Sequence, residues 1–396
     1  MSKVFLKKNE ERRLNVGHQW IFSNEIEKTE GIEKNGEVVE LYSSSNKFLG
    51  KGFYNKSSLI AYRHLTDREE EIDKAFLFKR ISMANSLRRK FKSCGNVYRM
   101  VNSESDFLPG LIIDKFDDRY SYQIFSIGMN EYAEIIKEIL TENFKAVLIV
   151  EKNDNELRVM EGLEKLEGIV YESTETPVSE DKTFVTEIDD IKYKIDLLNG
   201  QKTGFYLDQA GSRVLIRKYI NEKYRVLDLF CNEGGFALNA ASAGAADITG
   251  VDSSEHSINT AKANSVINNY ENIKFICKDV FEYMNELFQT TEKYDFIILD
   301  PPSFTKSKKN LIPALKGYIE LNTKAMRLLK PNSMLFTFSC SYHINESNFE
   351  DVIVKSAIEA KRRVQVIEKV SSSFDHPVLI QMNETKYLKG YLLRVI

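Results

Sequence analysis

Three acidic residues follow apolar stretches that have the character of buried strands, and a pair of glycines comes soon after the first. The acids are Asp228 after RVL, Asp252 at the end of ITGVD, and Asp279 at the end of FICKD. Gly234 and Gly235 let the backbone approach a ligand closely at a strand–helix turn. An acid that ends the second strand is placed to bind the two hydroxyls of a ribose. A glycine pair alone also fits a purely structural turn, but acids at three successive strand ends favour a ligand.

The glycine loop distinguishes between ligands that contain a ribose. A dinucleotide site needs G-x-G-x-x-G to cradle the pyrophosphate, whereas this loop reads CNEGG and contains Glu233. Because a carboxylate repels phosphate and attracts cations, the loop suits S-adenosylmethionine, which carries an ammonium and a sulfonium group. The sequence therefore predicts a site for S-adenosylmethionine.

A rigid turn follows the fourth apolar stretch, YDFIILD, where the sequence reads DPPSF over residues 300–304. Pro301 and Pro302 donate no backbone N–H and restrict the backbone. In S-adenosylmethionine enzymes that act on nucleobases, such a turn faces the base. Asp300 could therefore hold the N3/N4 edge of a cytosine, and Phe304 could stack on the base. The alternatives are a simple strand terminator for the prolines and a core position for Phe304.

A thiol ends the next apolar stretch, MLFTFSC, where Cys340 lies between Ser339 and Ser341. Carbon 5 of cytosine becomes nucleophilic once a thiolate adds to carbon 6; it can then attack a methyl sulfonium, and elimination restores the ring. Such a thiolate needs a partly exposed, electropositive setting, and His343 adds a polar side chain nearby. Cys340 is thus a candidate nucleophile, with an inert buried thiol as the alternative.

Strands and helices alternate from about residue 224 to the end of the stretch that contains Cys340. The expected helices begin at Gly235 and cover residues 254–268, 280–289 and 313–329. Near-continuous apolar strands that alternate with helices indicate a parallel sheet covered on both faces. The carboxyl ends of parallel strands share one edge, where ligands bind. The acids, the proline turn and Cys340 would meet there.

The first 180 residues predict two smaller β-rich pieces. Short strands over residues 37–42, 47–54 and 58–64 suggest a small barrel. Further along we expect a helix over 71–93 that ends at Cys94-Gly95, a hairpin that turns at Asp117-Asp118, a helix over 131–144, a linker over 171–182 that contains Pro177, and a hairpin over 185–196.

Composition limits the class of protein. With 396 residues, 42% of them hydrophobic and 29% charged, the chain reads as a soluble globular protein of two or three domains. No apolar stretch approaches the ~20 residues of a membrane span, and residues at the start do not resemble a signal peptide. The four cysteines form no metal or disulfide pattern, and we interpret Cys231 and Cys277 as structural. We therefore expect a cytoplasmic protein without a metal or a membrane partner.

Charge is unevenly distributed along the chain. Residues 1–100 hold 20 Lys and Arg against 13 Asp and Glu, although the net charge of the whole chain is −3. A basic first quarter suits a module that binds RNA, with ordinary variation of surface charge as the alternative. The candidate phosphate contacts, which solvated surface loops would also explain, are Lys7, Lys8, Arg12, Arg13, Lys306, Lys308 and Lys309.

Several motifs together carry a family resemblance. They are HQWIFSNEI (18–26), VNSESDFLPGLIIDKF (101–116), GQKTGFYLDQ (200–209), LDLFCNEGGFAL (227–238), DPPSF (300–304), FSCSYH (338–343), and DHPV with YLKGYLL near the end. They resemble the bacterial class I methyltransferases that form 5-methylcytosine in large-subunit (23S) ribosomal RNA. The resemblance covers the whole chain, and GQKTGFYLDQ is its most specific motif.

The resemblance implies an α/β fold in which two smaller domains precede the methyltransferase domain. An RNA-binding PUA domain, a small β-barrel, would cover residues 1–70, and a central α+β domain would cover residues 71–180. A Rossmann-like class I methyltransferase domain that uses S-adenosylmethionine would cover residues 181–396. The expected partner is ribosomal RNA, with a homodimer as a further possibility.

The resemblance also assigns site residues. Cys340 would be the nucleophile, and Asp300 would act beside it. The residues expected to contact the cofactor are Gln201, Lys202, Thr203, Phe205, Leu207, Asp208, Arg213, Asp228, Phe230, Asn232, Gly234, Phe236, Asp252, Ser253, Asp279, Val280, Asp300 and Pro301.

The chain departs from the family pattern at three places. After LDQ the family has Arg-Asp/Glu-Asn-Arg, whereas this chain has Ala-Gly-Ser and then Arg213. The glycine loop reads CNEGG in place of the more common Cys-Tyr-Thr-Gly-Gly. Ser303 stands where many other cytosine methyltransferases have a second cysteine, so the base that assists product release is not identified.

Two other functions stay open at this point. The first is methylation of an exocyclic nitrogen of guanine or adenine, in which Cys340 would take no part. The second is a non-catalytic RNA-binding protein with a vestigial methyltransferase domain.

Overall fold

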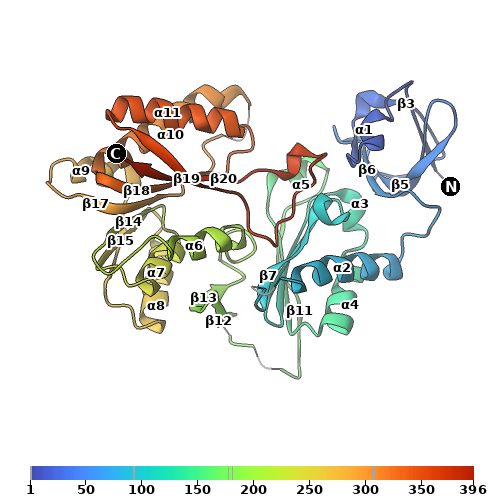
Figure 1. Ribbon diagram of the computed structural model, residues 1–396. Helices are drawn as coiled ribbons and strands as arrows, with labels where there is room; N and C mark the ends of the chain where they lie inside the picture. Colours follow the sequence, from blue (N-terminus) through green and yellow to red (C-terminus); the bar gives the residue numbers. More distant parts are fainter. Residues whose placement is uncertain (1, 92–93, 177, 181, 306–307) are drawn as a thin grey trace. The chain divides into compact units, whose positions relative to one another are not determined.

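The computed structural model describes residues 2–91, 94–176, 178–180, 182–305 and 308–396. Its elements are drawn in Figure 1. The chain divides into two compact units: the first comprises residues 1–186, 195–207 and 374–385, and the second comprises residues 187–194, 208–373 and 386–396. The domain boundaries expected near residues 70 and 180 stay predictions, and Pro177 of the expected linker lies outside the described residues.

The first unit begins with a six-stranded sheet in the order β2-β6-β5-β4-β1-β3. Its core includes the fully buried side chains of Val4, Leu6, Val39 and Leu41, which alternate along β1 and β4. The third strand expected in this region begins at Tyr62 instead of residue 58, because residues before it form a turn. The strands are β1 (Lys3–Leu6), β2 (Trp20–Ile21), β3 (Ile26–Glu30), β4 (Val38–Tyr42), β5 (Phe48–Tyr54) and β6 (Tyr62–Thr66).

A second sheet of the first unit has five strands in the order β11-β10-β9-β8-β7. They are β7 (Val97–Asn102), β8 (Leu111–Phe116), β9 (Arg119–Ile124), β10 (Leu148–Asn153) and β11 (Leu166–Glu172). The helices α2 (Lys74–Arg89) and α4 (Ala133–Phe144) share a hydrophobic core with this sheet. The shorter helices of the unit are α1 (Arg12–Asn15), α3 (Ile127–Asn130) and α5 (Glu156–Met160).

Local predictions for this part of the chain have mixed outcomes. The hairpin at Asp117-Asp118 is confirmed, because β8 and β9 pair as antiparallel neighbours across that turn. The helix end at Gly95 is wrong: α2 already ends at Arg89, and Lys90 caps it in a right-handed helical conformation. The hairpin over 185–196 is present as a two-stranded sheet of β12 (Thr183–Ile188) and β13 (Ile191–Asp196), through which the boundary of the two units passes.

The second unit is built on a seven-stranded sheet in the order β16-β15-β14-β17-β18-β20-β19. The five strands from β16 to β18 are parallel, as predicted. They are β14 (Arg225–Leu229), β15 (Asp247–Asp252), β16 (Ile273–Cys277), β17 (Tyr294–Leu299) and β18 (Leu329–Ser339), and the sheet is completed by β19 (Val364–Val370) and β20 (Lys389–Val395).

Two further strands, β19 and β20, extend the sheet beyond the strands that were predicted to be parallel. The last strand, β20, inserts between β18 and β19 and runs antiparallel to both. The apolar pattern of this strand indicates burial but not direction, so the sequence could not distinguish the two orientations.

Helices cover both faces of the seven-stranded sheet, as the alternating pattern predicted (Figure 1). One core contains side chains of α9 (Val280–Leu287), α10 (Leu311–Leu328) and α11 (Glu346–Ala360). The opposite core contains side chains of α6 (Ala210–Ile216), α7 (Gly235–Ser242) and α8 (Glu255–Ile267). Four consecutive residues of β17, from Phe296 to Leu299, are fully buried because they face these two cores alternately. None of the helices in the described part of the chain has the length and apolar content that a membrane crossing needs.

Candidate active site

The carboxyl edge of the parallel strands brings together candidates from five separate motifs. Asp228, Asp252, Asp279, Asp300 and Cys340 lie at or directly beyond the ends of β14, β15, β16, β17 and β18, respectively. Since these strands are neighbours and parallel, their ends share one edge of the second unit.

Asp228 is completely buried near the end of β14. Its Oδ2 accepts a hydrogen bond from the backbone N–H of Ala237 at 2.9 Å, which links the strand to the first turn of α7. Burial raises the pKa of Asp228 to about 8, with smaller contributions from Asp300 and Asp252. Oδ1 is buried without a hydrogen-bond partner among the described residues. The carboxyl group is therefore protonated at neutral pH and available to a further polar partner.

The loop between β14 and α7 has an unusual backbone. Phe230, Asn232 and Gly234 have positive φ angles of 64°, 46° and 84°. A Cβ atom on Gly234 would lie 2.9 Å from the ring of Phe275, so glycine is required for space as well as conformation. In the same loop, Oδ1 of Asn232 is buried and has no hydrogen-bond partner among the described residues.

The carboxylates at the ends of the next two strands accept hydrogen bonds from backbone N–H groups. The carboxylate of Asp252 accepts hydrogen bonds from the N–H groups of Asn232 at 3.0 Å and Ser254 at 2.9 Å. Asp279 is exposed and caps α9 by accepting from the N–H of Glu282 at 3.0 Å. A carboxylate oxygen has two lone pairs, so these bonds leave acceptor capacity for ribose hydroxyls and for an amino group. This donor and acceptor set fits a nucleoside that carries a cationic tail.

Other predicted contacts of the second unit differ in exposure. Ser253 is exposed beside Asp252, whereas Val280 is buried at the start of α9. Phe236 packs in the core against Phe336 and Phe338, with ring centroids 6.2 and 5.6 Å away. Only the backbone of Phe236 is therefore placed at the loop.

The end of the GQKTGFYLDQ motif belongs to the second unit and reaches the proline turn. The side chain of Gln209 donates a hydrogen bond to Oδ2 of Asp300 at 3.0 Å. The carboxylate of Asp208 accepts from the hydroxyl of Tyr387 at 2.6 Å. Arg213 is buried, and a Cβ on Gly235 would lie 2.9 Å from its Cδ, so the arginine packs against the start of α7.

The first part of the same motif belongs to the other unit. Thr203 is buried and donates to the carboxylate of Asp114. Lys202 lies 4.0 Å above the ring of Tyr206, and the hydroxyl of Tyr206 donates to Gln201 at 2.5 Å. Phe205 and Leu207 are buried. A cofactor contact for these residues stays a prediction.

Cys340 is half-buried and lies beside the proline turn. Its thiol donates to the backbone carbonyl of Pro301 at 3.8 Å. Ser341, the next residue, shares a hydrogen bond of 3.1 Å with the hydroxyl of Ser303 and another of 3.1 Å with the hydroxyl of Tyr318. Because Ser303 in turn donates to the carbonyl of Thr305 at 3.0 Å, these hydroxyls form a continuous chain. The chain fastens the turn to the strand end that carries the thiol.

Tyr318 and Lys389 complete the surroundings of Cys340. Burial raises the pKa of Tyr318 to about 12, so its hydroxyl keeps its proton at neutral pH. Lys389 comes from β20, and its ammonium donates to the carbonyls of Ser341 at 2.9 Å and Ile344 at 2.6 Å. Both residues lie far from Cys340 in the sequence.

Three functional candidates were missed by sequence reasoning. Gln209 was part of a quoted motif but was not assigned a contact, and Tyr318 lies on a helix with no local signal of its role. Lys389 could have been noticed, because it is a charged residue at the start of the apolar stretch YLKGYLL.

Other candidate residues have other surroundings. Phe304 packs against Tyr318 at 4.6 Å, which favours its core alternative. Cys231 is buried, whereas Cys277 is the last residue of β16 and is exposed, and the interpretation of both as structural stays a prediction. His343 is half-buried beside Tyr342. Lys309 is exposed, and Lys306 and the side chain of Lys308 lie outside the described residues.

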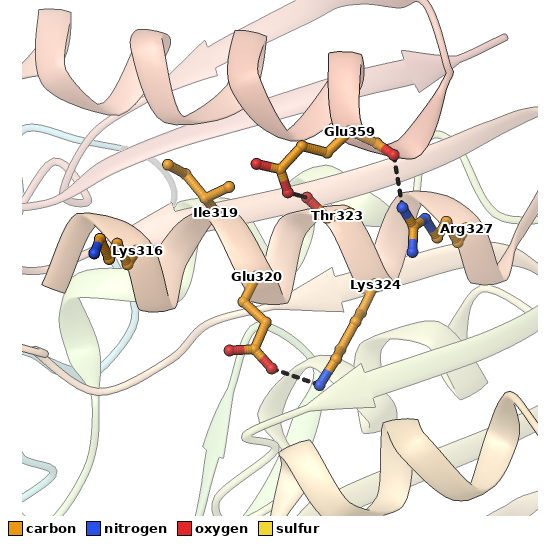
Figure 2. A pocket seen from close by; sticks show the side chains of 7 residues that line it. All are labelled: Lys316, Ile319, Glu320, Thr323, Lys324, Arg327 and Glu359. Atoms are coloured by element: carbon orange, nitrogen blue, oxygen red, sulfur yellow. Dashed lines mark hydrogen bonds and ion pairs between the residues drawn. The ribbon is translucent and has the colours of Figure 1, made fainter. Parts of the chain in front are cut away.

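A separate pocket lies between α10 and α11 (Figure 2). In this pocket the side chain of Lys324 donates to the carboxylate of Glu320 at 2.6 Å, and the side chain of Arg327 donates to the backbone carbonyl of Glu359 at 2.6 Å. None of the predicted site residues lines this pocket, so the candidate active site is the sheet edge.

Comparisons with known proteins identify two domain families in this chain. Residues 4–67 match the family of PUA-like domains, and residues 220–385 match a methyltransferase domain family. Ribosomal RNA large subunit methyltransferase I from Aliivibrio fischeri is 36% identical over 99% of this chain and 99% of its own length. The protein of the same name from Aeromonas salmonicida is 37% identical over 99% and 98%, respectively.

Solved structures share the fold over the whole chain. The crystal structure of SMU.776 complexed with SAH has a TM-score of 0.84 at 22% identity and covers 100% of both chains. A protein from Streptococcus mutans, assigned as a SAM-dependent methyltransferase, has a TM-score of 0.83 at 22% identity with the same coverage. The predicted fold, a PUA-like domain followed by a Rossmann-like methyltransferase domain, is therefore confirmed.

Proposed function

Because the chain belongs to the ribosomal RNA large subunit methyltransferase I family, we propose that it methylates carbon 5 of a cytosine in large-subunit ribosomal RNA, with Cys340 as a covalent nucleophile. At the coarser level the chain is an S-adenosylmethionine-dependent methyltransferase of large-subunit ribosomal RNA. The identity of the base and the role of the thiol are the proposed part.

One observation supports the covalent mechanism above others. The thiol of Cys340 lies 3.8 Å from the carbonyl of Pro301, and a hydrogen bond between Ser303 and Ser341 holds that arrangement. A base that stacks beside the proline turn would present its ring edge to the half-buried sulfur. Asp300 is fixed by Gln209 at the same turn and can bind the N3/N4 edge of cytosine.

The reaction then follows from the chemistry of a thiol and a pyrimidine. The thiolate of Cys340 would form a bond to carbon 6 while Asp300, in its carboxylic acid form, donates its proton to N3, so that no net negative charge builds up on the ring. Carbon 5 becomes nucleophilic and takes the methyl group, which S-adenosylmethionine supplies as an electrophile. Removal of the proton from carbon 5 by a base would expel the thiolate from carbon 6 and restore the aromatic ring, and N3 would return its proton to Asp300. The base for that last step is not assigned.

The residues proposed to hold S-adenosylmethionine follow from their surroundings. Asp252 would accept the ribose hydroxyls, and Asp279 would accept from the amino group of the adenine. The backbone of the loop over 230–234, with Oδ1 of Asn232, would face the amino acid portion. Asp208 and Arg213 lie on the segment that also positions Asp300.

Replacing Cys340 tests the proposal against methylation of an exocyclic nitrogen. Cys340→Ala should lose at least about 10³-fold in turnover on large-subunit RNA, because the covalent step has no substitute. Affinity for S-adenosylmethionine, measured by calorimetry, should be retained. The matched control is Cys277→Ala at the exposed cysteine of β16, which should keep full activity. Full turnover by Cys340→Ala would favour nitrogen methylation instead.

A further inference from the structure

Lys389 is a charged residue at the start of a strand that is otherwise almost wholly buried. In β20 it pairs with Ser339, the residue before Cys340. The strand β18, which ends next to Cys340, has β17 on one side and β20 on the other. The proline turn follows β17, so Lys389 lies on the opposite side of β18 from that turn. Cys340 is thus flanked by elements on both sides.

The ammonium of Lys389 is tied to the segment that follows the thiol. It donates to the carbonyl of Ser341 at 2.9 Å and to that of Ile344 at 2.6 Å, so it spans the turn between β18 and α11. Burial lowers the pKa of Lys389 to about 8, and a negative charge on Cys340 opposes that shift. The lysine and the thiol therefore interact electrostatically in a partly desolvated place, where such interactions are stronger than in water.

Other charged groups near this place have partners of their own. On α11, Glu350 binds Lys369 at 2.7 Å and accepts from the hydroxyl of Tyr391 at 2.8 Å. Tyr318 of α10 stays neutral because burial raises its pKa, and Asp300 binds Gln209. A negative charge on Cys340 raises the pKa of Lys389 and so opposes the effect of burial.

We propose that Lys389 is a positioning residue of the methyl transfer, which holds residues 341–344 in place and stabilises the thiolate of Cys340 by its positive charge. This inference rests on the proposed role of Cys340 and adds the electropositive setting that such a thiolate requires. A purely structural lysine would hold the turn without changing the reactivity of the thiol.

The reactivity of the thiol can be measured without RNA. Iodoacetamide alkylates thiolates, and mass spectrometry of peptides gives the rate at each cysteine as a function of pH. In the full-length protein, we expect Cys340 to reach its half-maximal rate about one pH unit below Cys277, the exposed control cysteine. In Lys389→Met that half-point should rise by about one pH unit, equivalent to a roughly tenfold lower rate at neutral pH. Lys389→Arg should keep most of the effect.

The outcomes separate this proposal from the proposed function. Equal half-points for Cys340 and Cys277 in the unsubstituted protein, or an unchanged profile in a folded Lys389→Met, would overturn the role of Lys389. Since the first comparison needs no variant, it also decides the matter if Lys389→Met does not fold. If Cys340→Ala still methylates RNA while Lys389→Met shifts the thiol profile, the proposed function fails but the effect of Lys389 stands.

Discussion

Asp228 and Lys389 illustrate how burial sets the charge of single residues in this site. Burial raises the pKa of the carboxyl group to about 8 and lowers the pKa of the ammonium to about 8. At neutral pH the edge of the sheet thus holds a neutral Asp228 and a cationic Lys389. The sequence showed that an acid ends the first strand, but its protonation depends on cores assembled from distant segments.

The raised pKa of Asp228 makes stability depend on pH. In the folded protein Asp228 keeps its proton up to about pH 8, whereas the unfolded chain releases it above about pH 4. The free energy of unfolding therefore falls as the pH rises from about 4 to 8. Relative to Asp228→Asn, the unsubstituted protein should lose about 1 to 3 kcal/mol of unfolding free energy between pH 5 and pH 7. Urea unfolding at the two pH values measures this. The prediction is contradicted if the free energy of unfolding changes equally with pH in the unsubstituted protein and in Asp228→Asn. The control is Asp351→Asn, at an exposed position of α11.

The hydroxyl chain makes a prediction about Ser341. Replacing it by alanine removes the hydrogen bonds to Ser303 and Tyr318 that fasten the proline turn. We expect kcat to fall about five- to tenfold, in line with the loss of one or two neutral hydrogen bonds, and KM for S-adenosylmethionine to stay the same. Ser356→Ala removes a buried serine hydroxyl of α11 away from this edge and should leave kcat unchanged. A fall in both variants would indicate a general loss of stability.

The parallel strands of the second unit could be predicted from the sequence, whereas the placement of β20 and the role of Tyr318 on α10 could not. The apolar strands and their terminal acids predicted the parallel sheet and its functional edge, because near-continuous apolar strands that alternate with helices indicate parallel strands buried on both faces. The antiparallel insertion of β20 has no such signal, and it is β20 that delivers Lys389. Tyr318 was likewise hidden, since a tyrosine on a helix reads as a core residue until the neighbouring strand end is known.

The two ends of α7 provide a matched pair of glycines, because Gly234 caps its start and Gly244 follows its C-terminal cap, Ala243. Gly234 and Gly244 have φ angles of 84° and 87°, but only at Gly234 would a Cβ clash, at 2.9 Å from Phe275. Gly244→Ala should cost about 1 kcal/mol of stability through backbone strain alone. Gly234→Ala should cost more and should weaken S-adenosylmethionine binding at least about tenfold, because the loop must shift. Calorimetric titration of both variants tests this, and equal affinities would contradict the assigned loop.

At the scale of the whole molecule, the chain combines a module that suits RNA with a catalytic sheet. Lys8 and Arg12 are exposed on the first unit, around a hollow that Arg13 and Glu25 also line. The excess of basic residues in the first 100 positions predicts an RNA-binding region, and residues 4–67 match PUA-like domains, but RNA binding by this part of the chain stays a prediction. A homodimer and a cytoplasmic location stay predictions.

Charge reversal on the first unit should lower the affinity for RNA and leave the affinity for S-adenosylmethionine unchanged. Lys8→Glu with Arg12→Glu should weaken RNA binding and reduce its dependence on salt by about one unit of slope for each lost phosphate contact. Affinity for S-adenosylmethionine should be unchanged. Lys218→Glu with Lys355→Glu, at exposed positions of the second unit, changes the net charge equally. If both pairs weaken RNA binding to the same degree, the effect comes from net charge alone.

The most direct test of the central claim is to trap the covalent adduct. Large-subunit RNA that contains 5-fluorocytidine cannot release the enzyme after methylation, because fluorine on carbon 5 does not leave as a proton does. Incubation with S-adenosylmethionine should give a complex that survives denaturation, with the nucleotide attached to the peptide that contains Cys340. A methylated exocyclic nitrogen on ordinary RNA, together with no adduct on Cys340, would contradict the proposed mechanism.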